Sequence, residues 1–284
     1  MIPSGRTFYK MSGSGNDFVM VDARQEAAGG LADPGVVQRV CARGTGVGAD
    51  GIVFLEPSDK ATIGLVYLNA DGSRAEFCGN ATLCTTRLAV ELGAADPGGL
   101  TIETDSGIVA ARIGAGANGG GKAALAERPE IDLQPVSDVR DTVTDIPVEP
   151  GELRIGFAVV GVPHLVILVK DVSTVDVVGR GRPLRSHRSL RKGANVNFVA
   201  RTADGGWRMR TYERGVEAET LACGSGSVAS AILLTAWGET AGGVELETRS
   251  GLGLRVRLER DTSCWRPSLS GDARVVYTGR LSEV

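Results

Sequence analysis

The sequence predicts an α/β protein made of two copies of one structural unit. A segment that begins at Cys78, CGNATLCTTRLAVELG, recurs about half a chain length later at Cys223 as CGSGSVASAILLTAWG, and each copy is followed by a similar segment, TIETDSG and ELETRSG. Self-similarity on this scale reflects a repeated architecture. The 284 residues allow two domains, and 42% apolar with 23% charged residues is ordinary globular usage, which excludes a disordered chain.

The two repeated segments predict helices over 81–92 and 228–237. The first has apolar residues near helical spacing and the second is apolar on nearly all sides, so we expect the second to be more deeply buried. Each helix follows Cys-Gly and a short polar residue, and each stops at a glycine, Gly93 or Gly238, suited to a left-handed terminal residue. Strands are predicted at 63–68, 100–103, 108–113, 155–160, 165–169, 196–200, 207–212, 244–247, 252–258 and 273–277.

Apolar periodicity fades between about residues 130 and 150, where proline and aspartate accumulate. We therefore expect a first domain of residues 1–130 with 272–284, which carries Cys78, and a second domain of residues 131–271, which carries Cys223. The glycine-rich tract 114–121 is expected to be a loop.

Composition narrows the class of function. With 31 basic and 34 acidic residues the net charge is −3, and no basic run suggests nucleic acid or an anionic membrane, so a small-molecule partner is expected. No apolar stretch is long enough to span a bilayer, and we expect a cytoplasmic protein. Five cysteines without a C-x-x-C spacing and two histidines favour neither a disulfide framework nor a zinc site. No metal is therefore expected. No cofactor is expected either, because no Walker-type loop occurs and Gly13-Ser14-Gly15-Asn16 lacks the strand, turn and helix context of a dinucleotide fingerprint.

Cys78 and Cys223 are the candidate catalytic residues. Each precedes a predicted helix, whose N-terminal field favours a thiolate over a thiol. If the two repeats face each other about a pseudo-twofold axis, the two sulfurs lie on either face of one α-carbon, with the amino-acid carboxylate on helix N–H groups. This arrangement predicts proton removal on one face and return on the other. Cys41, Cys84 and Cys264 have no repeat partner and are assigned to packing.

Six segments, in this order, point to one family. They are Gly15-Asn16-Asp17-Phe18-Val19, Gly46-Val47-Gly48-Ala49-Asp50-Gly51, Asn69-Ala70-Asp71-Gly72-Ser73 leading to Cys78-Gly79-Asn80, Gly161-x-Pro163-His164, Asn195-Val196-Asn197-Phe198-Val199, and Tyr212-Glu213-Arg214-Gly215 leading to Ala222-Cys223-Gly224-Ser225-Gly226. The chain resembles diaminopimelate epimerase over nearly its whole length. That family interconverts L,L- and meso-diaminopimelate without pyridoxal, for lysine and peptidoglycan precursor synthesis. The resemblance implies an α+β fold of two pseudo-symmetric domains, each a mostly antiparallel sheet wrapped around a central helix.

The resemblance also implies residue roles. Cys78 and Cys223 would be the two acid/base thiols, with His164 and Glu213 as auxiliary residues beside them. The reacting carboxylate would be held by Gly79, Asn80, Gly224 and Ser225. Substrate, chiefly its distal amino-acid end, would be bound by Asn16, Asn69, Asn195, Glu213 and Arg214. Relatives are homodimers, and Tyr277 matches an interface tyrosine.

Several of these residues also have a purely structural explanation. Asn16 and Asn69 neighbour glycines and suit turns, and Glu213 with Arg214 suits a solvated ion pair at a strand end. His164 suits a buried core histidine, and Tyr277 a strand residue packed on the core.

Three departures from the family pattern stand out. Val162 occupies a position where many members have a substrate-contacting asparagine, and Leu83 one where an arginine is usual. The segment 216–222 is one residue longer than the common pattern, so we expect a bulge to place Glu213 and Arg214.

Two other functions remain open. One is a two-thiol racemase or epimerase of another amino acid, of the proline, hydroxyproline or histidine type, which Val162 keeps admissible. The Glu213–Arg214 pair argues against an imino acid, since it suits a distal zwitterion that proline lacks. The other is an inactive scaffold of the same fold, which would have no need of two intact Cys-Gly helix starts.

Overall fold

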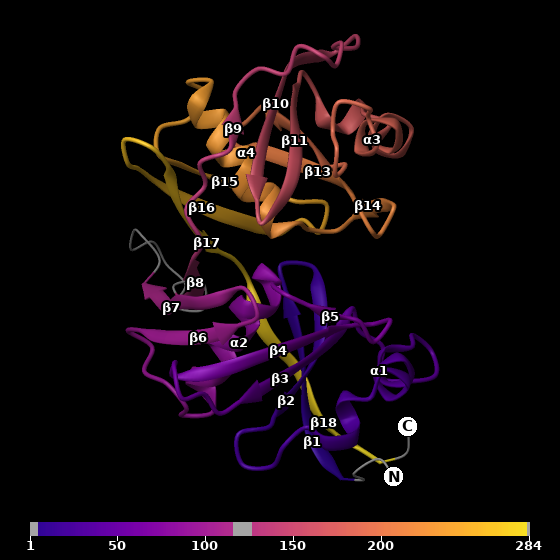
Figure 1. Cartoon of the computed structure of the whole chain (residues 1–284), viewed down its shortest axis with the longest axis vertical. Coiled ribbons are helices and arrows are strands. Elements are labelled where there is room, and N and C mark those ends of the chain that lie inside the picture. The colour runs from indigo at the N-terminus through magenta and orange to yellow at the C-terminus, as the bar shows by residue number, and fades with distance from the viewer. Residues whose placement is uncertain (1–4, 116–126, 283–284) are drawn as a thin grey trace. The chain divides into compact units, whose positions relative to one another are not determined.

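The computed structural model describes residues 5–115 and 127–282 and divides the chain into two compact units (Figure 1). The N-terminal unit takes the described residues up to Ile131 together with those from Ser270 onward. The C-terminal unit is Asp132–Leu269. Both units combine a sheet with few helices, which confirms the predicted α+β class. Among the described residues, no helix is long and apolar enough to cross a membrane.

Most of the N-terminal unit is β-structure. Its strands are β1 (Arg6–Gly13), β2 (Asn16–Asp22), β3 (Gly51–Glu56), β4 (Ile63–Asn69), β5 (Arg74–Ala75), β6 (Leu100–Thr104), β7 (Gly107–Ala115), β8 (Glu127–Asp132) and β18 (Ala273–Leu281). Its helices are η1 (Gly29–Ala32), α1 (Pro34–Cys41) and α2 (Gly79–Glu91). Residues 114 and 115 of the expected glycine-rich loop 114–121 belong to β7, and residues 116–121 lie outside the described ranges.

The C-terminal unit has the same kind of content. Its strands are β9 (Val139–Arg140), β10 (Glu152–Val160), β11 (Val162–Val169), β12 (Asn195–Arg201), β13 (Trp207–Glu213), β14 (Ala218–Thr220), β15 (Gly243–Glu247), β16 (Gly253–Arg260) and β17 (Trp265–Ser270). Its helices are η2 (Val172–Thr174), α3 (Val177–Arg185) and α4 (Gly224–Ala236).

Strand pairing repeats from one unit to the other. In the N-terminal unit β1 is antiparallel to β2, β2 parallel to β3, β3 antiparallel to β4, β4 parallel to β6 and β6 antiparallel to β7. In the C-terminal unit β10, β11, β12, β13, β15 and β16 follow with the same alternation. The repeat read from the sequence therefore extends through the whole sheet, beyond the two helices that revealed it.

Each sheet wraps around one central helix. Helix α2 packs against β1, β3, β4, β6, β7 and β18, and α4 packs against β10, β11, β12, β15 and β16. A second core on the other side of each sheet is covered by α1 or by α3. Both central helices end as predicted, because Gly93 and Gly238 have φ of 64° and 78°.

The predicted difference in burial between the central helices is wrong. Helix α2 buries 80–86, 88 and 89, and α4 buries 226–234. Polar residues can be buried in α2 because their hydroxyls bond within the helix: Thr82 Oγ1 donates to the Cys78 carbonyl at 2.9 Å and Thr86 Oγ1 to the Thr82 carbonyl at 2.8 Å.

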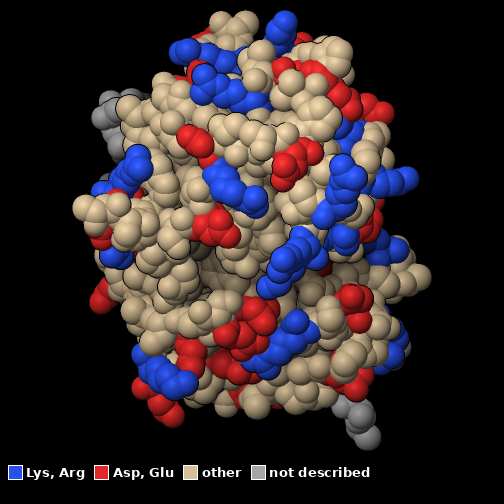
Figure 2. All heavy atoms as spheres, turned by 45° about the horizontal axis from the view of Figure 1, so that its top comes forward, with Lys and Arg blue, Asp and Glu red and all other residues tan. Residues whose placement is uncertain are grey.

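Charged side chains are mixed over the surface. In the face shown in Figure 2, Lys and Arg lie among Asp and Glu. Ion pairs between such side chains include Arg74 with Asp105, at 2.5 Å, and Lys60 with Glu103, at 2.7 Å. Exposed pairs of this kind contribute at most about 1 kcal/mol each, so the fold depends on its buried cores.

Candidate active site

The two repeated cysteines occupy equivalent positions at the N-termini of the two central helices. Cys78 precedes α2 with φ −143° and ψ 112°, and Cys223 precedes α4 with φ −137° and ψ 108°. Neither side chain caps its helix by a hydrogen bond. The first N–H groups of a helix have no acceptor within the helix, so both units present N–H donors and positive potential next to a sulfur.

The contacts that hold the two N-termini are also equivalent. The Cys78 carbonyl accepts from the N–H and the hydroxyl of Thr82, both at 2.9 Å. The Cys223 carbonyl accepts from the N–H and the hydroxyl of Ser227, at 2.9 and 3.0 Å. Cys78 is half-buried, whereas Cys223 is buried with its Sγ 3.7 Å from Ser225 Oγ. The sequence-predicted helix starts are thus built alike, down to the residue four positions into each helix.

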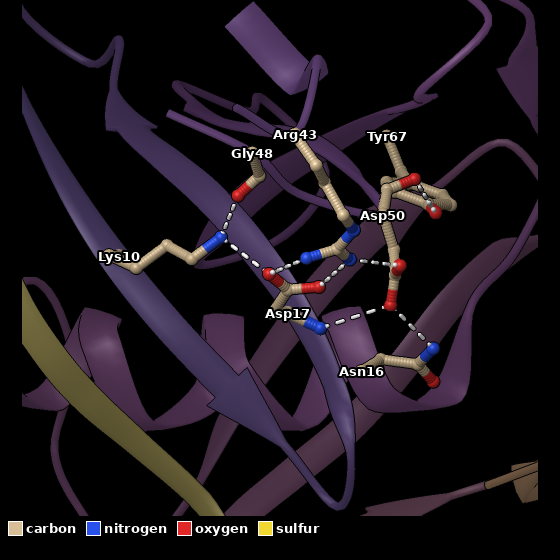
Figure 3. A network of polar contacts seen from close by, with 7 residues as sticks. All are labelled: Lys10, Asn16, Asp17, Arg43, Gly48, Asp50 and Tyr67. Carbon is tan, nitrogen blue, oxygen red and sulfur yellow. Dashed lines mark hydrogen bonds and ion pairs between the residues drawn. The ribbon is translucent and has the colours of Figure 1, made fainter. Parts of the chain in front are cut away.

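In the N-terminal unit, a polar network orients Asn16 (Figure 3). Asn16 is the first residue of β2, after a tight turn in which Ser14 and Gly15 have positive φ. Its Nδ2 donates to Asp50 Oδ2 at 2.9 Å, and Arg43 donates to Asp50 Oδ1 at 2.8 Å. Because a carboxylate accepts hydrogen bonds and donates none, Asp50 fixes which end of the Asn16 amide is nitrogen.

Asp17 anchors the same network. Arg43 and Lys10 both donate to its carboxylate, at 2.6 Å each for the shortest contacts, and Lys10 also donates to the Gly48 carbonyl. Burial opposes ionisation of Asp17, but the hydrogen bonds from Arg43 and Lys10 lower its pKa below the ordinary value. The carboxylate therefore stays charged and keeps Arg43 against Asp50.

The network reaches the first turn of α2 through Asn80. Asn80 Nδ2 donates to Asn16 Oδ1 at 2.6 Å, which brings two of the predicted site residues together. Asn80 is 3% exposed, and its Oδ1 is buried without a hydrogen-bond partner among the described residues. A buried acceptor without a donor is costly, and it suits a ligand that brings one. The third predicted residue, Asn69, lies at the end of β4, where its Nδ2 donates to Ser73 Oγ at 3.0 Å.

In the C-terminal unit, adjacent strands bring together His164, Asn195 and Arg214. His164 on β11 pairs in register with Asn195 on β12. The Arg214 N–H donates to Asn195 Oδ1 at 2.7 Å, and Arg214 Nη1 donates to the Lys192 carbonyl at 2.6 Å. Arg214 is half-buried, and its hydrogen bonds to the Asn195 side chain and the Lys192 carbonyl hold it next to Asn195.

Glu213 and Arg214 are placed by a hairpin and not by the expected bulge. Strands β13 and β14 pair without a register shift, with Glu213 opposite Ala218. The turn is closed by the Glu217 N–H, which donates to the Glu213 carbonyl at 2.8 Å, and Glu217 itself has φ 58°. The extra residue is absorbed outside the paired segment, so the strand end that carries Glu213 and Arg214 is regular.

The structure also shows where the two other departures from the family pattern, Val162 and Leu83, lie. Val162 is half-buried at the start of β11. Leu83 is fully buried on α2, where an apolar side chain needs no ion partner. Cys41 and Cys84 are buried, as the packing assignment requires, and Cys264 is half-buried.

Among residues 5–115 and 127–282, no three His, Cys, Asp or Glu side chains gather where they could share a metal ion.

Sequence reasoning missed three residues of this arrangement: Asp50, Asn197 and Thr211. Asn197 lies beside His164, with its Nδ2 3.2 Å from His164 Nδ1, and Thr211 Oγ1 donates to Asn197 Oδ1 at 3.0 Å. Asp50 and Asn197 stood within the quoted motifs, but without strand register nothing assigned them a partner.

His164 makes stability depend on pH. Burial, and to a smaller extent the nearby Arg214, lowers its pKa to about 3. Its folded pKa is therefore below the unfolded value of 6.5, and the unfolded chain binds a proton that the folded chain does not. We expect the free energy of unfolding to fall as pH decreases from about 6.5 to about 3, by up to about 1.4 kcal/mol per pH unit from this group.

Urea unfolding between about pH 7 and pH 4 measures this dependence. The difference between the wild type and His164→Gln isolates the histidine from the carboxylates. His187→Gln, at a half-buried site, is the matched control and should keep the wild-type slope. Equal slopes for His164→Gln and the wild type would contradict a neutral, buried His164.

Comparison with known proteins places this arrangement in a family. The family model for diaminopimelate epimerase matches residues 8–119 and 156–274. Diaminopimelate epimerase from Gemmatimonas aurantiaca is 42% identical over 97% of this chain and 99% of its own length, and that from Aquifex aeolicus is 38% identical over 97% and 98%.

Solved structures share the fold at lower identity. A phenazine biosynthesis protein of the PhzF family from Bacillus anthracis superposes with a TM-score of 0.74 at 17% identity, covering 98% of this chain and 99% of that one. A hydroxyproline epimerase from Agrobacterium vitis gives 0.65 at 16% identity, covering 98% and 93%. These structures show the fold, and the full-length sequence matches show that the chain belongs to the diaminopimelate epimerase family.

Proposed function

We propose that this chain is an isomerase that interconverts L,L-diaminopimelate and meso-diaminopimelate, with Cys78 and Cys223 as its acid/base pair. The observation that carries the proposal is the equivalence of the two helix N-termini, each with a cysteine in the same backbone conformation. A two-base inversion needs two groups that can exchange roles, and equivalent surroundings give both sulfurs the same chemistry.

The proposed reaction conserves charge and needs no oxidant. One cysteine, as thiolate, takes the α-hydrogen as a proton, so the C–H bond breaks and an S–H bond forms. The other cysteine, as thiol, gives its proton to the opposite face of the α-carbon and becomes the thiolate. In the reverse direction the roles exchange. The helix N-termini favour each thiolate.

The substrate carboxylate next to the reacting carbon would be held by the first-turn N–H groups at Gly79, Asn80, Gly224 and Ser225, which also stabilise the charge that develops during proton removal. Asn80 Oδ1, which has no hydrogen-bond partner in the described part of the chain, would accept from the α-ammonium group. His164 and Glu213 are the proposed auxiliary residues beside the thiols.

The distal amino-acid end would be bound by Asn16, Asn69, Asn195, Glu213 and Arg214. The planar guanidinium of Arg214 can donate two parallel hydrogen bonds to a carboxylate, and Glu213 can accept from an ammonium group. Asn195 Oδ1 already accepts from the Arg214 N–H, so its Nδ2 is left to donate to the distal carboxylate. Binding energy from this end would position the weakly acidic α-carbon for the thiols. A cytoplasmic setting suits this chemistry, because both thiols must stay reduced.

Hydrogen exchange tests the function and its substrate. Purified, reduced protein in deuterated water is incubated with L,L-diaminopimelate, proline, hydroxyproline or histidine, and α-deuteration and stereoinversion are followed by NMR and chiral chromatography. Inversion of diaminopimelate alone is the expected result, and it would make Val162 a tolerated variation. Inversion of another amino acid would assign a different substrate to the same two-thiol chemistry. Absence of exchange with all four would reject the proposed activity.

We further propose that the protein is a homodimer in which β18 lies at the interface. Val276 and Tyr277 on this strand are 57% and 46% exposed, and the Tyr277 ring packs on Phe8 at a centroid distance of 5.9 Å. Neighbouring exposed apolar side chains on a regular strand suit a protein contact.

Changing Tyr277→Glu should shift the protein from dimer to monomer in size-exclusion chromatography with light scattering, because a carboxylate would have to be buried at the contact. Val148→Glu is the matched control, since Val148 is 55% exposed elsewhere and should leave the dimer intact. A monomeric wild type, or a dimeric Tyr277→Glu protein, would reject this interface.

A further inference from the structure

Three buried polar side chains on adjacent strands of the C-terminal unit form a row. The polar row consists of His164 on β11, Asn197 on β12 and Thr211 on β13, which are at most 2% exposed. Thr211 Oγ1 donates to Asn197 Oδ1 at 3.0 Å, and Asn197 Nδ2 lies 3.2 Å from His164 Nδ1 and donates to the Leu165 carbonyl at 2.9 Å.

These contacts settle the orientation of the Asn197 amide. The Leu165 carbonyl can only accept, so the amide atom 2.9 Å from it is the nitrogen, and the hydroxyl of Thr211 supplies the donor that the amide oxygen needs. The second hydrogen of the Asn197 Nδ2 group faces His164 Nδ1. Burial keeps the ring neutral, because the pKa of His164 is lowered to about 3. A neutral ring that accepts at Nδ1 carries its proton on Nε2.

The fold does not require polar residues here. In the N-terminal unit, strand register places Phe18, Val53 and Tyr67 at the positions that correspond to the polar row. These three side chains are at most 7% exposed, and the rings of Phe18 and Tyr67 pack edge to face at 5.7 Å. Burying polar groups costs free energy that the apolar version avoids. A functional role therefore explains the polar row better than packing does.

His164 Nε2 is buried without a hydrogen-bond partner in the part of the chain that the structure describes. We propose that Asn197, held by Thr211 and the Leu165 carbonyl, is a positioning residue that fixes His164 as the Nε2–H tautomer, so that His164 acts in the site as a hydrogen-bond donor and not as a base. The inference rests on the proposed function, in which His164 lies beside the thiols. The donor would be directed at an anionic acceptor, the thiolate or the substrate carboxylate.

The tautomer can be measured without any substrate. In ¹⁵N-labelled protein, long-range ¹H–¹⁵N correlation spectra distinguish a protonated from an unprotonated ring nitrogen. The chain has two histidines, so His187→Gln assigns the signals. The expected result is a protonated Nε2 and an unprotonated Nδ1 for His164. A protonated Nδ1 in the wild type would overturn the proposal.

Two variants test the role of Asn197. Asn197→Asp replaces the amide by a carboxylate, which can only accept, so the proton should move to Nδ1 and kcat should fall by about 10²- to 10³-fold with KM nearly unchanged. An unchanged Nε2–H tautomer in this variant would overturn the proposal.

Asn197→Val covers the case in which the aspartate variant does not fold, since valine occupies the corresponding position of the N-terminal unit. Here the Nδ1 resonance should shift on losing the hydrogen bond from the amide, and an unmoved resonance would equally overturn the proposal. These spectra do not depend on activity. An inactive wild type with the expected tautomer would reject the proposed function alone.

Discussion

Replacing either Cys78 or Cys223 by alanine is expected to lower kcat for the inversion of diaminopimelate by about 10²- to 10⁴-fold, the range that a positioned general acid or base contributes. Each sulfur would act as base in one direction and as acid in the other. Both variants should therefore lose both directions, L,L to meso and meso to L,L. The measurement is the initial rate in each direction by chiral chromatography under reducing conditions.

The expected losses are similar because the two sulfurs occupy equivalent sites. The cysteine backbones differ by only a few degrees in φ and ψ, and each cysteine carbonyl is held by the residue four positions later. Cys264→Ala is the control, since this half-buried thiol has no repeat partner and should leave both rates unchanged. A single variant that kept most of its activity in one direction would contradict a two-thiol mechanism, because one sulfur would then be dispensable.

The central helices could be predicted because their signals are local. Apolar spacing, Cys-Gly at the start and a glycine at the end fix α2 and α4 within a few residues. The strands β1, β2 and β3 were not predicted. In β2 and β3, four or five consecutive residues are buried, so FVMV and IVFL are continuous apolar runs without the alternation that marks a half-buried strand. Helix α3 was missed because it contains glycine and Pro183 and is held by the burial of Val177 and Leu184 on the sheet, which is tertiary packing and not propensity.

The candidate site was predictable in part for the same reason. The residues named from motifs lie at helix starts and strand ends, where a short segment carries its own signal. Asp50, Asn197 and Thr211 were missed because their partners are distant in sequence: Asn16 for Asp50, and His164 for Asn197. Such contacts depend on strand register, and a slip of one residue would turn the same side chains to the opposite face.

Replacing Gly226 by alanine is expected to damage both the fold and the site. A β-carbon on Gly226 would lie 2.3 Å from Asn197 Oδ1 and 3.2 Å from Cys223 Sγ. Neither neighbour can move freely, because Asn197 is fixed by two hydrogen bonds and Cys223 begins α4. We expect a loss of about 1–3 kcal/mol in the free energy of unfolding, as for overpacking of a core, and a fall in kcat of about 10²-fold from displaced site groups.

The repeat supplies the reason why glycine is needed in one unit and not in the other. The residue that corresponds to Gly226 in α2 is Ala81, and the strand residue that corresponds to Asn197 is Val53. A methyl group on the helix is compatible with a valine on the strand, whereas an amide whose orientation is fixed leaves room only for hydrogen. Gly226 and Asn197 therefore form a matched pair, and the double variant Gly226→Ala with Asn197→Val should regain stability relative to Gly226→Ala alone while remaining low in kcat.

Urea unfolding and initial rates of the two single variants and the double variant form a complete cycle. Gly99→Ala is the control for the substitution itself, since a β-carbon there lies within 4 Å of no described residue outside its chain neighbours and should change neither quantity. Additive losses of stability in the double variant would mean that Gly226 and Asn197 do not interact. The polar row would then not explain why residue 226 is a glycine. Recovery of stability without recovery of kcat would show that the amide is retained for the reaction at the expense of simpler packing.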